Sequence, residues 1–261
     1  TTDGSVSATG AFTSNITGLW GDTIYYVRAY AVNSYGTSYG DIIQFVTPPA
    51  IPPALNLPLV RVMNITGTTG TGYSSILNNG GAPVTSRGIC ITTDRIHYDY
   101  IPSATVNLND LGEFSTDITG LSPGVTYYAK GYATNTGGTG YTNEISFITA
   151  AFVPITTIAP NNIGYTTAQS GGVISNTGNS VITSRGICWS LGKNPTTALS
   201  TKTSEALGSD GTGSFTSSIT GLIPAVKYYV RAYAVNAAGV SYGNLDSLVT
   251  VAPGAPAVVT A

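Results

Sequence analysis

An internal repeat constrains this chain more than any other feature of its sequence. A run with the pattern Gly-x-Phe-Ser/Thr at residues 10–19 returns at 112–121 and at 213–222, so the copies lie 102 and 101 residues apart. A period of this length indicates tandem domains, because about 100 residues are enough to bury a core of their own. The 261 residues of the chain therefore accommodate two or three such modules.

The first copy of the repeat is expected to be incomplete. A tyrosine-rich run occurs three times in the same register, at 25–33, 127–135 and 228–236, whereas an upstream Thr-Ser-Arg-Gly-Ile-Cys run occurs only in the second and third copies. Because the chain opens on Thr1 and not on Met, we expect this end to be a processed end or a cut in a longer chain. The predicted division is the C-terminal half of a module at 1–48, whole modules at 49–149 and 150–250, and a linker, following strand or donor strand at 251–261.

The pattern within each module predicts β-strands. Short runs of Thr, Val, Ile and Tyr alternate in polarity, and clusters of Gly, Asn and Pro separate them. In the last whole module the predicted strands are 155–159, 165–174, 182–190, 199–204, 213–219, 227–236 and 240–249. Seven antiparallel strands in about 100 residues are typical of a two-sheet sandwich. The predicted fold class is therefore all-β, with tandem seven-stranded antiparallel sandwiches of which the first is incomplete.

One corner of the repeat resembles fibronectin type III domains. Leu-Ser-Pro-Gly-Val-Thr-Tyr at 121–127 and Leu-Ile-Pro-Ala-Val-Lys-Tyr at 222–228 are similar to the turn that precedes the sixth strand of that family. The resemblance implies a tyrosine corner, in which a tyrosine hydroxyl bonds to nearby backbone. The matching residues are Tyr25, Tyr127 and Tyr228.

The wider pattern resembles the tandem modules of large secreted surface proteins of Bacteroidota. It is carried by Ser-Arg-Gly-Ile-Cys-Trp-Ser at 184–190 together with Tyr-Tyr-Val-Arg-Ala-Tyr-Ala at 228–234. This resemblance implies an extracellular or cell-surface location. It does not select a function, because such sandwiches serve as spacers, adhesins and polymer subunits alike.

The tyrosine-rich run also predicts a repeated outward stripe. Alternate residues of a strand point to opposite faces, so each module is expected to present a cation between two outward tyrosines. The outward residues are Tyr26, Arg28 and Tyr30, then Tyr128, Lys130 and Tyr132, then Tyr229, Arg231 and Tyr233. The stripe is either an aromatic surface for a glycan or protein, or a same-face ladder that covers its own sheet.

Two places depart from the repeated plan and are candidate interfaces. Residues 94–100 gather polar and aromatic groups where the other whole module has Leu-Gly-Lys-Asn-Pro, and Trp20 is a large ring on a turn. The candidates in the first place are Arg95, His97, Tyr98 and Tyr100. They form either a recognition loop or module contact, or charges that shield an edge strand.

No residues are arranged for catalysis or for a cofactor. The chain has a single histidine, so a general base with an oriented partner is not expected, and the protein is predicted not to be an enzyme. Cys90 and Cys188 occupy equivalent positions in separate modules, which excludes a disulfide within one module and favours small buried thiols. No cofactor or tetrahedral metal site is predicted, although a calcium ion at a module junction stays an alternative.

Charge and hydropathy limit the classes of partner that the chain is expected to bind. Only 8% of residues are charged, the net charge is −2 and no basic run occurs, so nucleic acid is not expected. No uninterrupted apolar stretch reaches the ~18 residues of a membrane span. We therefore predict a non-enzymatic extracellular structural protein: a surface fibre or filament subunit that forms a homo-oligomer or polymer, or contacts neighbouring modules of a longer chain. Strand donation by 251–261 would complete its first module. Alternatives are an adhesin or glycan-binding accessory region with a glycan or protein ligand, and a virion fibre or decoration protein.

Overall fold

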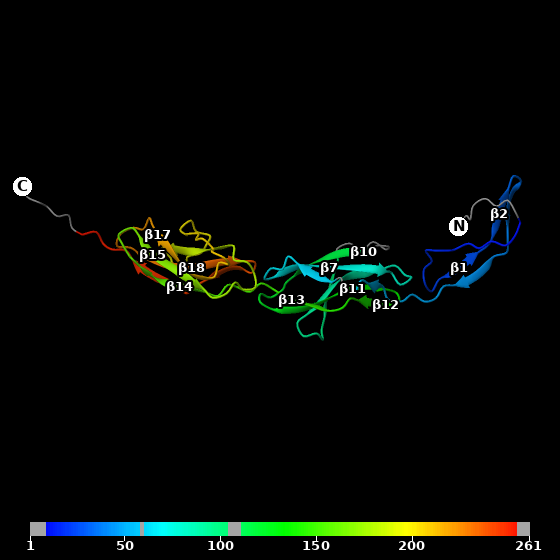
Figure 1. Ribbon diagram of the computed structural model, residues 1–261, viewed down its shortest axis with the longest axis horizontal. Coiled ribbons are helices and arrows are strands. Elements are labelled where there is room, and N and C mark those ends of the chain that lie inside the picture. Colours follow the sequence, from blue (N-terminus) through cyan, green and yellow to red (C-terminus); the bar gives the residue numbers. More distant parts are fainter. Residues whose placement is uncertain (1–8, 58–59, 104–110, 255–261) are drawn as a thin grey trace, which may run out of the picture. The chain divides into compact units, whose positions relative to one another are not determined.

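The computed structural model describes residues 9–57, 60–103 and 111–254. Within these ranges every regular element is a β-strand, and the strands form antiparallel sheets (Figure 1). The described residues contain no helix that is long and apolar enough to cross a membrane. The all-β class predicted from the alternating polarity is thus confirmed.

The C-terminal sandwich consists of strands β14 to β20 in two sheets. One sheet has the order β14-β15-β17, and the other has β18 at its centre with β16 on one side and β19 and β20 on the other. The strands of the first sheet are β14 (Ile155–Asn161), β15 (Ala168–Ile174) and β17 (Gly213–Ile219). Those of the second are β16 (Ser184–Ser190), β18 (Lys227–Asn236), β19 (Gly239–Tyr242) and β20 (Asp246–Val249).

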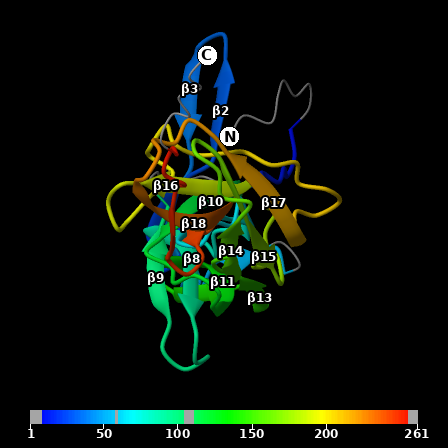
Figure 2. The same ribbon diagram turned by 90° about the vertical axis from the view of Figure 1, so that its left-hand side faces the viewer.

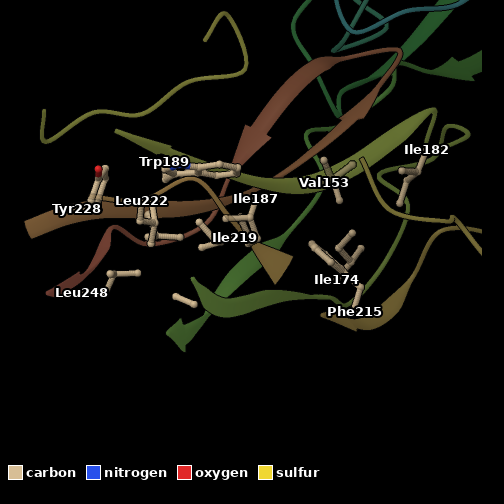
Figure 3. Packing of buried hydrophobic residues seen from close by; sticks show 14 residues of the cluster. Val153, Ile174, Ile182, Ile187, Trp189, Phe215, Ile219, Leu222, Tyr228 and Leu248 are labelled. Atoms are coloured by element: carbon tan, nitrogen blue, oxygen red, sulfur yellow. The ribbon is translucent and has the colours of Figure 1, made fainter. Parts of the chain in front are cut away.

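The core of this sandwich lies between the two sheets. Along β17 every second residue is buried from Phe215 to Ile219, so that Phe215, Ser217 and Ile219 face inward while Thr216 and Ser218 face solvent. The inward residues of β16 and β18 meet them from the other sheet. Figure 3 shows the labelled side chains of this core, among them Ile174, Ile187 and Ile219, gathered between the strands.

Two of the predicted strands differ from the structure. The segment 199–204 forms only an isolated bridge, Cys188 to Lys202, and the predicted strand 240–249 is split into β19 and β20. The split has a local cause in Thr157 of β14. Its hydroxyl accepts from the backbone N–H of Ala232 at 3.0 Å and donates to the backbone oxygen of Asn244 at 2.6 Å, so β18 and the last strand lose their direct pairing there.

Glycine is required at this break. A Cβ atom on Gly243 would lie 2.5 Å from the Thr157 hydroxyl, closer than real contacts allow. The backbone N–H of Gly243 still bonds to the oxygen of Ala232 at 2.9 Å. A side chain from the first strand of one sheet thus enters the opposite sheet and interrupts its edge, which sequence periodicity does not reveal.

The middle sandwich repeats this plan with strands β5 to β13. One sheet contains β5 (Ala54–Leu55), β6 (Arg61–Met63), β7 (Thr69–Asn78) and β10 (Gly112–Thr119). The other contains β8 (Ser86–Thr92), β9 (Asp99–Pro102), β11 (Thr126–Asn135), β12 (Gly138–Tyr141) and β13 (Ile145–Ile148). The registers correspond between copies, since Cys90 pairs with Lys130 as Cys188 pairs with Arg231. Strand β9 stands where the C-terminal sandwich has only the isolated bridge.

The N-terminal segment, residues 9–48, has four short strands and lacks a second layer among its described residues. β1 (Ile24–Val27) pairs with β4 (Ile43–Val46), and β2 (Tyr30–Asn33) forms a hairpin with β3 (Gly36–Tyr39) (Figure 2). The run 10–19 is not a strand here, although its counterparts form β10 and β17. In the C-terminal sandwich this run pairs with β15, and residues 9–48 contain no such partner strand. We keep the boundaries 1–48, 49–149, 150–250 and 251–261 as a proposal for the module limits.

Candidate functional site

The three matched tyrosines each anchor a turn. The hydroxyl of Tyr25 accepts a hydrogen bond from the backbone N–H of Trp20 at 2.9 Å. Tyr127 and Tyr228 accept equivalent bonds at 3.0 Å, each from the residue five positions earlier. This is the geometry that the resemblance to fibronectin type III domains implies for a tyrosine corner. Trp20 is half-buried and its backbone is held by this bond, so the turn itself is part of the scaffold.

A threonine directly after the last strand of each repeat bonds to the same corner from the other side. The Thr149 hydroxyl donates to the backbone oxygen of Ser122 at 2.7 Å, and the Thr250 hydroxyl donates to that of Ile223 at 2.6 Å. Thr47 does the same in the N-terminal segment, at 2.5 Å from the oxygen of Trp20. Sequence reasoning missed these residues, although their recurrence at the same place in all three copies is the signal that finds them.

We expect Tyr228→Phe to destabilise the C-terminal sandwich by about 1 to 3 kcal/mol, because the N–H of Ile223 loses its partner. Urea unfolding followed by the fluorescence of Trp189, which lies in the same core, measures the change. Tyr229→Phe is the matched control, since Tyr229 is the neighbouring half-buried tyrosine of β18 and its hydroxyl does not bond to the Ile223 corner. Equal stability of both variants would show that the corner bond is dispensable.

The cations of the predicted stripe lie over rings from other segments of the same repeat. The guanidinium of Arg28 lies 3.8 Å from the ring centre of Tyr39, and that of Arg231 lies 4.5 Å from Tyr242. The Lys130 ammonium lies 4.6 Å from the ring of Tyr98. Each cation is therefore engaged across the sheet, with a contact worth about 0.5 to 1 kcal/mol at an exposed site.

Two stripe positions are buried, unlike the predicted exposed stripe. Tyr132 and Tyr233 are only 4% and 3% exposed. The Tyr233 hydroxyl donates to the backbone oxygen of Thr203 at 2.6 Å, and the ring of Tyr132 meets Tyr100 edge-on with centroids 5.0 Å apart. The chain that follows β16 or β8 covers this part of the sheet. Tyr30 is 40% exposed and Tyr26 is 68% exposed, whereas Tyr128 and Tyr229 are half-buried.

The glycine of the Ser-Arg-Gly-Ile-Cys run permits this covering. A Cβ on Gly186 would lie 2.4 Å from the backbone oxygen of Thr203, and one on Gly88 would lie 2.1 Å from that of Ile101. The covering segment therefore passes directly over each glycine. The same pattern in two copies makes this a feature of the scaffold.

Residues 94–100 begin with a tightly bonded turn. Asp94 accepts hydrogen bonds from the backbone N–H groups of Ile96 at 2.8 Å and His97 at 2.9 Å, and its other oxygen lies 2.9 Å from Nδ1 of His97. These bonds, with the His97 side chain as the largest contributor, hold the pKa of Asp94 well below its usual range. The Asp94 side chain is 46% exposed and that of His97 is 85% exposed, so the turn lies on the surface.

The following residues build a surface cluster that includes two unforeseen partners, Glu144 and Tyr141. Nε of Arg95 lies 3.1 Å from Oε1 of Glu144, and its guanidinium lies 3.8 Å from the ring centre of Tyr128. The Tyr98 hydroxyl donates to Oε2 of Glu144. We call Arg95, Tyr98, Tyr100, Tyr128, Lys130, Tyr141 and Glu144 the aromatic cluster.

Within the aromatic cluster two tyrosine hydroxyls bond to each other. Those of Tyr100 and Tyr141 lie 2.5 Å apart. Burial, followed by this bond, raises the pKa of Tyr141 to about 12. In sequence, Tyr141 and Glu144 lie near the end of the middle sandwich. They reach residues 95–100 only because β8, β9, β11 and β12 pair in one sheet. Of the predicted residues, Trp20 is absent from this cluster, and the described contact of the His97 side chain is with Asp94.

A buried arginine organises each complete sandwich, and sequence reasoning missed its role. Arg185 is 8% exposed, and its guanidinium donates four hydrogen bonds to the backbone oxygens of Ala206, Gly211 and Thr212 at 2.6 to 3.1 Å. It also lies 5.1 Å from the ring centre of Phe215. The guanidinium of Arg87 lies the same distance from the ring centre of Phe114, and Arg87 is 5% exposed. The sequence feature that indicates this role is a charged residue at a repeated position within an apolar strand.

The cysteines are free buried thiols. Burial raises the pKa of both Cys90 and Cys188 to about 11. In the part of the chain that the structure describes, no group of three or more His, Cys, Asp or Glu side chains is arranged to hold a metal ion. Both thiols are packed inside their own sandwiches.

We expect both thiols to resist alkylation in the folded chain. At pH 8 only roughly one thiol in a thousand is ionised when the pKa is about 11, and burial also blocks access. Mass spectrometry after iodoacetamide treatment should find unmodified cysteines in the native chain and two modified ones in guanidinium chloride. Rapid labelling of the native chain would contradict this burial.

Among known proteins, only solved structures are similar to this chain. No family model and no curated protein matches the chain. The crystal structure of the chicken CNTN1 FN1–FN3 domains is 14% identical, covers 88% of this chain and 77% of its own, and has a TM-score of 0.36. The crystal structure of titin domains A168–A170 is 15% identical, covers 88% and 75%, and has a TM-score of 0.38. The strand order and registers of the chain itself show a fibronectin type III-like antiparallel β-sandwich fold.

Proposed function

We propose that this chain is a non-enzymatic structural protein of the cell surface or extracellular space, whose tandem sandwiches form part of a fibre or filament. The observation that carries the proposal is the contrast between matched positions of the repeat. Phe12 is 58% exposed, whereas its counterparts Phe114 and Phe215 are 5% and 7% exposed. An apolar face of this kind is costly in water and favours association with another polypeptide segment.

The segments that enter each complete sandwich are fixed by side-chain hydrogen bonds, which suits an array of modules that transmits force. Nδ2 of Asn135 donates to the backbone oxygens of Ile51 and Asn79, both at 2.7 Å. Nδ2 of Asn236 bonds in the same way to Ala151 and Thr177. Each of these asparagines thereby ties the chain entering its sandwich to a loop of that sandwich. The proline-rich composition of the entering segments adds stiffness.

Electron microscopy and light scattering of the purified chain at neutral pH test the proposal. Filaments, or polymers whose mass rises with concentration, are the expected result. A homogeneous monomer at all concentrations that neither polymerises nor binds another surface protein would contradict a role in assembly.

The finer hypothesis of strand donation concerns residues 251–261. Val251 is bonded to the C-terminal sandwich, where its N–H donates to the oxygen of Gly164 at 3.0 Å. Residues 255–261 lie outside the described residues, so donation by this tail stays a prediction. A chain that ends at Val251 should fail to polymerise if the tail is the donor, and unchanged polymers would exclude it.

A second candidate function is adhesion through the aromatic cluster. Tyr100 is 52% exposed and Tyr141 is 40% exposed, and the loops next to their strands carry the Arg95–Glu144 ion pair, so the cluster offers both rings and charged groups. Exposed rings beside polar groups suit a glycan or protein ligand. Binding to a glycan array that is lost in Tyr100→Ala but kept in Tyr165→Ala, another exposed tyrosine, would support this function.

A further inference from the structure

The N-terminal segment presents an apolar face whose equivalents are core in both complete sandwiches. Ile16 is 43% exposed, while Ile118 and Ile219 are fully buried. Ala31 is exposed, whereas the matching alanines of β11 and β18 are fully buried. We call Phe12, Ile16, Val27 and Ala31 the open face.

The complete sandwiches show what covers these positions. In the C-terminal sandwich β17 pairs along its whole length with β15, where Phe215 is opposite Gly172 and Ile219 is opposite Ala168. The central strand β18 pairs with β16 from Ser184 to Ser190. The counterparts of β17 and β18 in the N-terminal segment have no such neighbours in the part that the structure describes.

The covering strand opposite the phenylalanine must have a small residue. A Cβ on Gly172 would lie 2.7 Å from Cε1 and Cζ of Phe215, so the ring fills the space that a side chain would take. The equivalent position in the middle sandwich is Ser74, which is 1% exposed. A strand that covers Phe12 is therefore expected to have Gly or Ser at this position.

The second covering strand must supply an arginine. Arg185 and Arg87 each lie 5.1 Å from the ring centre of the phenylalanine that corresponds to Phe12. The next residue is glycine in both copies because another segment crosses it, and the isoleucine after that is fully buried. The strand pattern is therefore Arg-Gly-Ile-Cys, as in β8 and β16.

The backbone of the N-terminal segment also selects a peptide over other ligands. The Tyr25–Asn33 stretch pairs with β3 and β4 on one side only among the described residues. In the complete sandwiches the other edge of this strand pairs with β8 or β16, a pairing that an extended peptide can reproduce and a glycan or lipid cannot. The side chain of Asn33 is exposed, whereas its counterparts Asn135 and Asn236 each donate hydrogen bonds to two backbone oxygens. This difference also favours a peptide as the ligand.

We propose that the open face binds a polypeptide segment made of two β-strands, one with Gly or Ser opposite Phe12 and one of the Arg-Gly-Ile-Cys type. This deepens the proposed function by naming the chemistry of the partner. The tail 251–261 contains no arginine and has Pro253 and Pro256, so it does not have this pattern. The occupant is thus a segment like β15 and β16, and a second copy's tail is an alternative outcome of the test.

A labelled peptide with the sequence of residues 165–190 and the change Cys188→Ala provides the probe. Fluorescence anisotropy with the full chain should show saturable binding. Arg185→Ala in the peptide should weaken binding by about tenfold or more, and Gly172→Val should abolish it. Equal binding of the three peptides would overturn the proposal, as would preferential binding of a 251–261 peptide.

Matched variants of the chain locate the site. Ile16→Asp should abolish binding, and it should leave the two complete sandwiches folded because Ile16 is exposed. Ile24→Asp is the control, because Ile24 and its counterparts Thr126 and Lys227 are all exposed. Binding that survives Ile16→Asp, or is lost only in Ile24→Asp, would place the occupant elsewhere.

A chimeric chain tests the same proposal if the free peptide self-associates. Residues 152–212 are fused ahead of residue 10, since 213 and 10 are equivalent positions of the repeat. Hydrogen exchange at residues 11–17 should slow at least about tenfold relative to the parent chain. Unchanged exchange would overturn the proposal. Filament formation is a separate readout, so this inference and the proposed function can fail independently.

Discussion

Replacement of Arg185 by leucine is expected to destabilise the C-terminal sandwich by about 3 to 5 kcal/mol. The guanidinium satisfies backbone oxygens of Ala206, Gly211 and Thr212 in a buried place, and leucine leaves these acceptors without partners. The loss approaches the whole stability of many domains of this size. Urea unfolding in a Trp20→Phe background, in which Trp189 is the remaining tryptophan, measures it.

Two control variants separate charge from geometry at this position. Arg185→Lys keeps the charge but loses the planar fork that reaches several oxygens, so an intermediate loss is expected. Lys193→Leu removes an exposed cation from the same sandwich and should change stability by less than about 0.5 kcal/mol. If Arg185→Leu behaved like Lys193→Leu, the buried arginine would have no structural role.

The second large effect is expected at Ile219. Ile219→Ala should cost about 2 to 5 kcal/mol, because the side chain is fully buried and its removal leaves a cavity. Ile16→Ala removes the same atoms at the matching repeat position, where the residue is 43% exposed. That variant should change stability by less than about 0.5 kcal/mol at concentrations where the chain is monomeric.

The pair of isoleucine variants therefore measures whether the first repeat is open. Both are compared by urea unfolding, with circular dichroism as a second probe of the whole chain. A loss at Ile16 as large as the loss at Ile219 in a monomeric chain would mean that another part of the same chain covers it.

Much of the fold follows from the repeat and its alternating polarity. The runs that contain β15, β16, β17 and β18 were predicted within a few residues, because their polarity pattern is set by burial on one face. The break at Gly243 was not predicted, because it depends on the Thr157 side chain of a distant strand. The segment 199–204 has alternating polarity as well, yet the structure gives it only one bridge.

The candidate sites were less accessible to sequence reasoning. The tyrosine corner followed from the family resemblance, whereas the burial of Tyr132 and Tyr233 depends on segments that cross the sheet. The role of Arg185 depends on loop carbonyls up to 27 residues away along the chain. Glu144 joins Arg95 only through the pairing of the strands that carry their neighbours.

Hydrogen exchange of the monomeric chain tests the central claim most directly, because amide protection reports pairing residue by residue. The claim is that the first repeat is an open part-sandwich beside two complete ones. Amides of β17 and of β10 should exchange slowly, while those of residues 11–17 exchange at least a hundredfold faster. Equal protection of residues 11–17 and Gly213–Ile219 in a verified monomer would contradict the account.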